Sequence, residues 1–86
     1  MVNVKEATRA AFSYFSGLYA ANTSDVRLEE VELSEDEKNW LVTLSYLPGS
    51  SVQVALRGNT MPREYKVFRI DALTGEVKSM KIRKVE

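Results

Sequence analysis

The sequence predicts a single α+β domain, in which one N-terminal helix packs on a four-stranded antiparallel meander sheet. Three observations predict it. Apolar side chains recur at helical spacing over residues 4–21, which is the pattern of an amphipathic helix. Large apolar side chains stand at every second position from Trp40 to Tyr46, which is the period of a strand. Residues 65–83 read as two strands around a Thr-Gly turn. A helix followed by four strands gives a two-layer domain of α-β-β-β-β order over residues 1–86.

The helix is expected to run from Val4 to Ala21. Asn3 can cap its first turn, and Glu6 can return a hydrogen bond to the Asn3 amide, which makes a capping-box start. Asn22 begins a turn-forming stretch and tolerates the left-handed conformation that often follows a helix. The stripe that should face the sheet consists of Val4, Ala7, Ala11, Phe15 and Leu18, flanked by Phe12, Tyr14 and Tyr19.

The first hairpin is expected to join residues 26–33 to residues 40–47 over a polar loop. In the first of these strands the alternation of apolar residues changes phase after Leu28, so one extra residue must lie between its two halves. A β-bulge at Glu29–Glu30 accounts for that change of phase. The second strand alternates without interruption, and the face that begins at Trp40 is expected to point inward.

The stretch from Pro48 to Pro62 has two interpretations. Its length is unusual for a loop without structure in a small domain, and residues 51–56 alternate enough to extend the hairpin as a strand. The other interpretation is a mobile loop that binds a partner. In either case the candidate binding residues in this stretch are Val52, Val54 and Leu56.

The last hairpin is expected to pair residues 65–72 with residues 76–83 around the turn Leu73-Thr74-Gly75. Gly75 can supply the positive φ that such a turn requires. Asp71 can accept hydrogen bonds from backbone N–H groups of the turn.

The two faces of these strands have different residues. Phe68, Ile70, Met80 and Ile82 are expected to face the core. Both faces of residues 65–72 are partly apolar, which indicates either a central strand or an outer face that a partner covers. The candidate binding residues on that outer face are Tyr65, Val67 and Arg69.

The composition argues against several chemistries. The chain has no cysteine and no histidine, so the usual ligands of zinc, copper and haem and the usual base of a nucleophilic triad are missing. The acidic run Glu35-Asp36-Glu37 lies in a polar turn and lacks the spacing of a calcium loop. No apolar run is long enough to cross a membrane, and the N-terminus lacks the pattern of a secretory signal. We therefore expect a cytoplasmic protein (unless a signal peptide is missing from the given residues) that is not an enzyme, uses no cofactor or metal and does not enter the membrane.

The charges are balanced but unevenly placed. The formal net charge is zero, yet residues 1–47 hold eight acidic and four basic side chains, and residues 48–86 hold four acidic and eight basic ones. The alternative function is therefore binding of nucleic acid or another anionic ligand by the basic second half, residues 57–84. The zero net charge makes nucleic acid the less favoured partner.

The last hairpin resembles the repeat unit of PepSY domains. The similarity lies in residues 65–77, which read as a strand, an Ile-Asp pair, a Thr-Gly turn and a Glu-Val strand start. The helix and the strand that begins with Trp40 are similar to the rest of such a unit. The resemblance implies a small non-catalytic module of the kind found with peptidases or envelope proteins and proposed to bind or inhibit them.

The order of elements also resembles the cystatin fold, a helix held by a four-stranded antiparallel sheet. Gln53 and Gly58 stand near the place of the cystatin Gln-x-Val-x-Gly loop, but their spacing differs, and the Pro-Trp loop is missing. We therefore draw no expectation of cysteine-protease inhibition from this likeness.

The function that the sequence predicts is a non-catalytic protein-interaction module, which binds or inhibits another protein such as a peptidase. An open sheet has two edges that must be paired or protected. In the meander order one edge is acidic, with Glu29, Glu30 and Glu32, and the other is basic, with Lys78 and Lys81. The expected partner is another protein or a second copy of this chain, which adds a strand to one edge. The opposite charges also have a second interpretation, protection of the edges against pairing.

Overall fold

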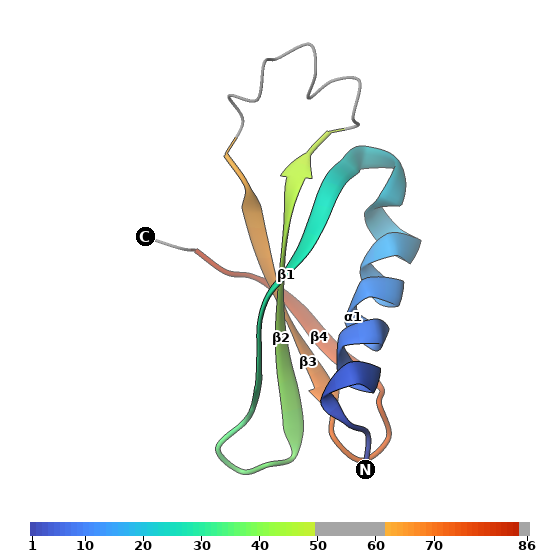
Figure 1. Ribbon diagram of the computed structural model, residues 1–86, viewed down its shortest axis with the longest axis vertical. Helices are drawn as coiled ribbons and strands as arrows, with labels where there is room; N and C mark the ends of the chain where they lie inside the picture. The colour runs from blue at the N-terminus through green and yellow to red at the C-terminus, as the bar shows by residue number, and fades with distance from the viewer. Residues whose placement is uncertain (50–61, 85–86) are drawn as a thin grey trace.

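The computed structural model describes residues 1–49 and 62–84, and its order of elements confirms the predicted fold class (Figure 1). The helix α1 (Val4–Tyr19) continues into a short 3-10 turn η1 (Ala20–Asn22) and then into the strands β1 (Thr23–Leu33), β2 (Asn39–Pro48), β3 (Glu64–Asp71) and β4 (Val77–Ile82). The strands form one sheet in the order β1-β2-β3-β4, with every neighbouring pair antiparallel.

The helix begins with the predicted capping box. The backbone N–H of Glu6 donates to the Asn3 Oδ1 atom at 2.8 Å, and the Asn3 N–H donates to Glu6 Oε1 at 3.0 Å. Two N–H groups that lack partners inside the helix are satisfied in this way. At the other end the α-helix stops at Tyr19, earlier than expected, and the Thr23 hydroxyl donates to the Tyr19 carbonyl at 2.9 Å.

The core lies between α1 and the inner face of the sheet, with the helix on one side of the sheet only (Figure 1). Ala7 and Ala11 have no exposed surface, so the helix backbone approaches the sheet closely there. Phe15 lies beside Tyr46 and Phe68, with ring centroids 4.8 Å and 6.4 Å away, respectively. The buried residues of the core are Ala7, Ala11, Phe15, Val42, Leu44, Tyr46, Phe68 and Ile70.

The predicted helix stripe is too long at both ends. Val4 is 43% exposed and Leu18 is 55% exposed, so neither belongs to the core. A sheet twists and a helix is nearly straight, so the two surfaces approach most closely over the middle turns. Angular position on the helix therefore identified the correct face but could not show where contact with the sheet ends.

The strand β1 is irregular in two places. Its pairing with β2 shifts between Leu28 and Glu30, which confirms the bulge predicted from the change of phase. A second shift lies between Ser24 and Arg27, where Asp25 has a φ of 51°. The strand starts at Thr23, earlier than the predicted Val26, and its first pair joins Thr23 to Pro48.

The turn between β3 and β4 follows its predicted chemistry. Gly75 has a φ of 81°, and Asp71 Oδ1 accepts the N–H groups of Leu73 and Thr74 at 2.8 Å and 3.0 Å. Met80 packs against the core as expected. Ile82 does not, since it is 73% exposed, and the prediction that it faces the core was wrong. It lies at the end of the outer strand β4, paired with Lys66, and no further strand of the described residues lies beside it to support an apolar contact.

Most of the chain between β2 and β3 is not described by the structure. Gly49 follows β2 with a φ of 94°. Residues 50–61 lie outside the described residues, so neither interpretation of this stretch is tested.

Candidate functional site

The face of the sheet opposite α1 carries the candidate site. Because side chains alternate along a strand, residues that pair across neighbouring strands share a face. We call this surface the helix-free face. It consists of residues that are cross-strand partners of one another and point away from α1: Glu30, Glu32, Leu41, Thr43, Ser45, Tyr65, Val67, Arg69, Ser79 and Lys81.

Tyr65, Val67 and Arg69 lie together on the helix-free face, as the sequence indicated. They pair with Ser45, Thr43 and Leu41, respectively. Tyr65 and Val67 are half-buried and Arg69 is exposed. Val52, Val54 and Leu56 lie outside the described residues, so the structure does not place them.

One part of this face is a network of charged and hydroxyl groups centred on Ser45. The Ser45 hydroxyl is fully buried, donates to Glu29 Oε2 at 2.5 Å and accepts from Arg63 Nε at 3.0 Å. The same arginine donates from Nη1 to Asp25 Oδ2 at 2.8 Å, and Arg27 forms a second ion pair with that carboxylate at 2.8 Å. Hydrogen bonds from Arg27 and then from Arg63 hold the pKa of the Asp25 carboxyl below its usual value. These contacts tie β1, β2 and the start of β3 together.

A second pair of contacts joins the residue after β4 to β1 and β2 across the sheet. Arg83, just after β4, donates from Nη1 to the Thr43 hydroxyl at 2.8 Å and to Glu30 Oε1 at 3.2 Å. Residues from all four strands or their immediate flanks therefore surround one hollow of ≈ 240 Å³, which is lined by Glu29, Glu30, Thr43, Tyr65 and Arg83. Inside this hollow Arg83 is paired with Glu30, and Glu29 accepts the hydrogen bond from Ser45.

The neighbouring hollow on the same face is different. It has a volume of ≈ 170 Å³ and is lined by Leu41, Val67, Arg69, Ser79 and Lys81. In the part of the chain that the structure describes, no ion pair involves Arg69 or Lys81. The hollow thus combines two cationic side chains, Arg69 and Lys81, with two apolar ones, Leu41 and Val67, and the Ser79 hydroxyl. Like charges that are diagonal neighbours on a sheet face repel one another, so an anion placed between them would be stabilised.

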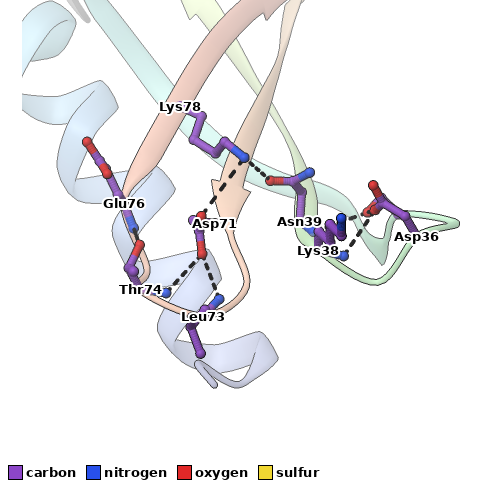
Figure 2. Close-up of polar contacts among 9 residues, drawn as sticks. Asp36, Lys38, Asn39, Asp71, Leu73, Thr74, Glu76 and Lys78 are labelled. Carbon is purple, nitrogen blue, oxygen red and sulfur yellow. Dashed lines mark hydrogen bonds and ion pairs between the residues drawn. The ribbon is translucent and has the colours of Figure 1, made fainter.

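The third hollow lies at the end of the molecule where the β3–β4 turn and the β1–β2 loop meet (Figure 2). It has a volume of ≈ 440 Å³ and is lined by residues of those two connections and by the N-terminus: Met1, Glu37, Lys38, Asp71, Ala72, Leu73 and Lys78. Its polar groups are used by the fold. Lys78 Nζ donates to Asn39 Oδ1 at 2.9 Å and lies 3.9 Å from Asp71 Oδ2.

The two aspartates near this hollow are acceptors of turn hydrogen bonds. The Thr74 and Leu73 amides lower the pKa of Asp71, and the Ser34 hydroxyl and the Lys38 amide lower the pKa of Asp36. A carboxyl that is held in its charged form is suited to fixing a turn and unsuited to donating a proton near neutral pH. We therefore assign the contacts of Figure 2 to folding rather than to a binding site.

Two further searches cover the described residues only. Within residues 1–49 and 62–84, no group of three or more acidic, histidine or cysteine side chains is placed to hold a metal ion. Among the same residues, no helix has the length and apolar character needed to cross a membrane.

Comparison with known proteins adds no relative. No protein-family model, no curated protein and no solved structure matches this chain. The likenesses to PepSY domains and to cystatins therefore remain resemblances in sequence pattern.

Sequence reasoning missed the roles of Arg63 and Ser45 on the helix-free face. In the sequence, Arg63 is one of the eight basic residues of the second half, and Ser45 is a polar position of its strand. A signal was present for Arg63, because it precedes Tyr65 by two residues and so continues the same face if the strand is extended. No local signal links Arg63 to Asp25, which is 38 positions away in the chain.

Proposed function

We propose that this protein is a non-catalytic interaction module that binds another protein through the helix-free face. The observation that carries the proposal is the surface beside β4, which no described helix or strand covers. Leu41 and Val67 form an apolar floor there, and Arg69 and Lys81 stand over it without an ion pair among the described residues. An apolar centre with a charged rim is the usual composition of a protein interface.

The PepSY resemblance supports the same class of function. It implies a module that binds or inhibits a larger protein, and a peptidase is the class of partner that it implies. A small domain that acts by binding needs no catalytic group, and the carboxyls with lowered pKa are engaged in the contacts of the fold.

Nucleic acid is the alternative ligand of the basic second half. The pairing of Arg63 with Asp25, of Lys78 with Asp71 and of Arg83 with Glu30 weakens that alternative. A phosphate backbone would have to compete with these carboxylates, and the gain from releasing counterions would be smaller. The capture experiment below distinguishes the two ligands.

The test is capture of a partner on a support to which this protein is attached through its helix α1. The chain has no cysteine, so Ser16→Cys, at an exposed helix position, allows biotin to be attached on the side away from the helix-free face. Proteins captured from nuclease-treated lysate of the source cells are identified, purified and titrated against variants. We expect Arg69→Glu/Lys81→Glu to weaken binding about tenfold or more, because two interfacial charges are reversed.

The matched control is Lys5→Glu/Arg9→Glu, which makes the same charge change at two exposed positions of α1. It should change the affinity less than about twofold. Equal losses in both double variants would contradict the proposed face. Capture is repeated from untreated lysate. Material that is retained from untreated lysate and lost after nuclease treatment would replace the proposal with the nucleic-acid alternative.

A further inference from the structure

The strand β4 is one of the two outer strands of the sheet. Its pairing with β3 shifts once, between the pairs Arg69–Ser79 and Ile70–Val77, and is regular from Ser79 to Ile82. In the described part of the chain it pairs only with β3. The other outer strand, β1, is interrupted by two shifts of register and contains the positive φ of Asp25. Bulges of this kind protect an edge from pairing with another strand. The edge that remains available is therefore that of β4.

The free hydrogen-bonding groups of this edge can be assigned from the ladder. The Arg83 N–H donates to the Tyr65 carbonyl at 2.9 Å, and the next pairs along the strand are Ile82 with Lys66 and Lys81 with Val67. In an antiparallel ladder hydrogen-bonded pairs alternate with pairs that share no hydrogen bond. Lys81 therefore bonds to β3 as Arg83 does, whereas the N–H and C=O groups of Met80 and Ile82 are directed away from it.

The side chains along the edge divide by face. On the helix side Ile82 is 73% exposed, and Met80 is half-buried next to Phe68, which contacts Tyr14 at 6.3 Å between ring centroids. On the helix-free side lie Ser79 and the exposed Lys81, beside Arg69. The edge is thus apolar on one face and cationic on the other.

We propose that β4 accepts an extended segment of a partner protein in which apolar and acidic residues alternate. The segment pairs with the outward N–H and C=O groups of Met80 and Ile82. Its apolar side chains lie beside Ile82 and its carboxylates face Lys81 and Arg69, because side chains of paired strands share their faces. Charge complementarity selects this occupant over a second β4 strand, which would bring another Lys81 to the same edge.

Because this proposal deepens the proposed function, its test must separate the two. The probe is a random peptide library displayed on phage and selected on the immobilised protein. We expect the selected peptides to alternate apolar and acidic residues. When synthesised, they should lose affinity about tenfold or more if each acidic residue is replaced by lysine.

The decisive variant is Ile82→Pro. Proline removes the outward N–H of residue 82, which β3 does not use, and proline is tolerated on the solvent side of an edge strand. Ile82→Val is the matched control, since it keeps the N–H and a β-branched side chain. Binding should fall about tenfold or more in Ile82→Pro and change less than about twofold in Ile82→Val. Circular dichroism establishes that both variants fold. If Ile82→Pro fails to fold, Lys81→Glu replaces it and should abolish the preference for acidic peptides.

Several outcomes overturn the proposal. These are a library that yields no binder, selected peptides without acidic residues, and equal binding to Ile82→Pro and Ile82→Val. Concentration-dependent self-association that Ile82→Pro abolishes would assign the edge to a second copy of this chain. Displacement of the selected peptides by a nucleic acid with the same number of negative charges would show that Arg69 and Lys81 bind phosphate. These tests of β4 can fail while Arg69→Glu/Lys81→Glu still weakens binding of the captured partner. In that case the proposed function stands and strand addition is rejected.

Discussion

Replacing Phe68 by alanine should lower the free energy of unfolding by about 3–5 kcal/mol. Phe68 is fully buried and lies at the centre of the core, where the rings of Tyr14 and Phe15 both lie nearly perpendicular to its ring, at 6.3 Å and 6.4 Å between centroids. The substitution removes apolar surface and leaves a cavity that a short sheet and a single helix cannot close. A domain of this size has a total stability of about 5–15 kcal/mol or less, so the loss would be a large part of it.

The measurement is unfolding in urea, with Val67→Ala as the control. Val67 is the next residue in β3 but lies half-buried on the helix-free face, and its truncation should cost about 1 kcal/mol. The melting temperature of Phe68→Ala should fall by more than about 12 °C. Equal losses in the two variants would show that the helix does not cover the face that carries Phe68.

Removing the Ser45 hydroxyl should cost about 1–3 kcal/mol of unfolding free energy, which is large for the deletion of one oxygen atom. Ser45 is fully buried on the side of the sheet away from the helix, and its hydroxyl joins Glu29 to Arg63. In Ser45→Ala the exposed Glu29 can turn to water, whereas Arg63, whose side chain is 19% exposed, loses a partner of its Nε where water reaches poorly. The penalty of an unsatisfied group, rather than the net value of one hydrogen bond, sets the size of the effect.

The control for Ser45→Ala is Ser79→Ala, a serine on the same face in β4 with no hydrogen bond through its hydroxyl among the described residues. Its effect should stay within about 0.5 kcal/mol. A double-mutant cycle with Arg63→Ala should give a coupling of at least about 0.5 kcal/mol, because the two side chains touch. Additive losses would mean that the contact between Ser45 and Arg63 does not stabilise the fold.

The features that the sequence predicted correctly depend on neighbours in the chain. The capping box of Asn3 and Glu6 and the turn around Gly75 need only a few residues to form. The bulge after Leu28 was visible because the phase of alternation is fixed by the strand itself. Such local rules were sufficient for the order of elements and for the placement of Tyr65, Val67 and Arg69 on one face.

The features that were missed or wrong depend on how distant elements meet. Whether Leu18 and Ile82 are covered is decided by where the helix and the sheet end relative to one another, and no spacing of residues encodes that. The contact between Arg83 and Glu30 joins positions 53 apart in the sequence and arises from the twist of the whole sheet. The sequence could supply the charges of the candidate site, but only the fold shows which of them neutralise one another.

The central claim is that β4 presents free backbone groups in the isolated protein, and amide hydrogen exchange tests it most directly. At a concentration where sedimentation shows a monomer, we predict that the amides of Met80 and Ile82 exchange almost as fast as those of an unstructured peptide. The amides of Lys81 and Arg83, which bond to β3, should exchange on the order of a hundredfold more slowly. If Met80 and Ile82 are protected as strongly as Lys81, the edge is already covered and cannot accept a partner strand.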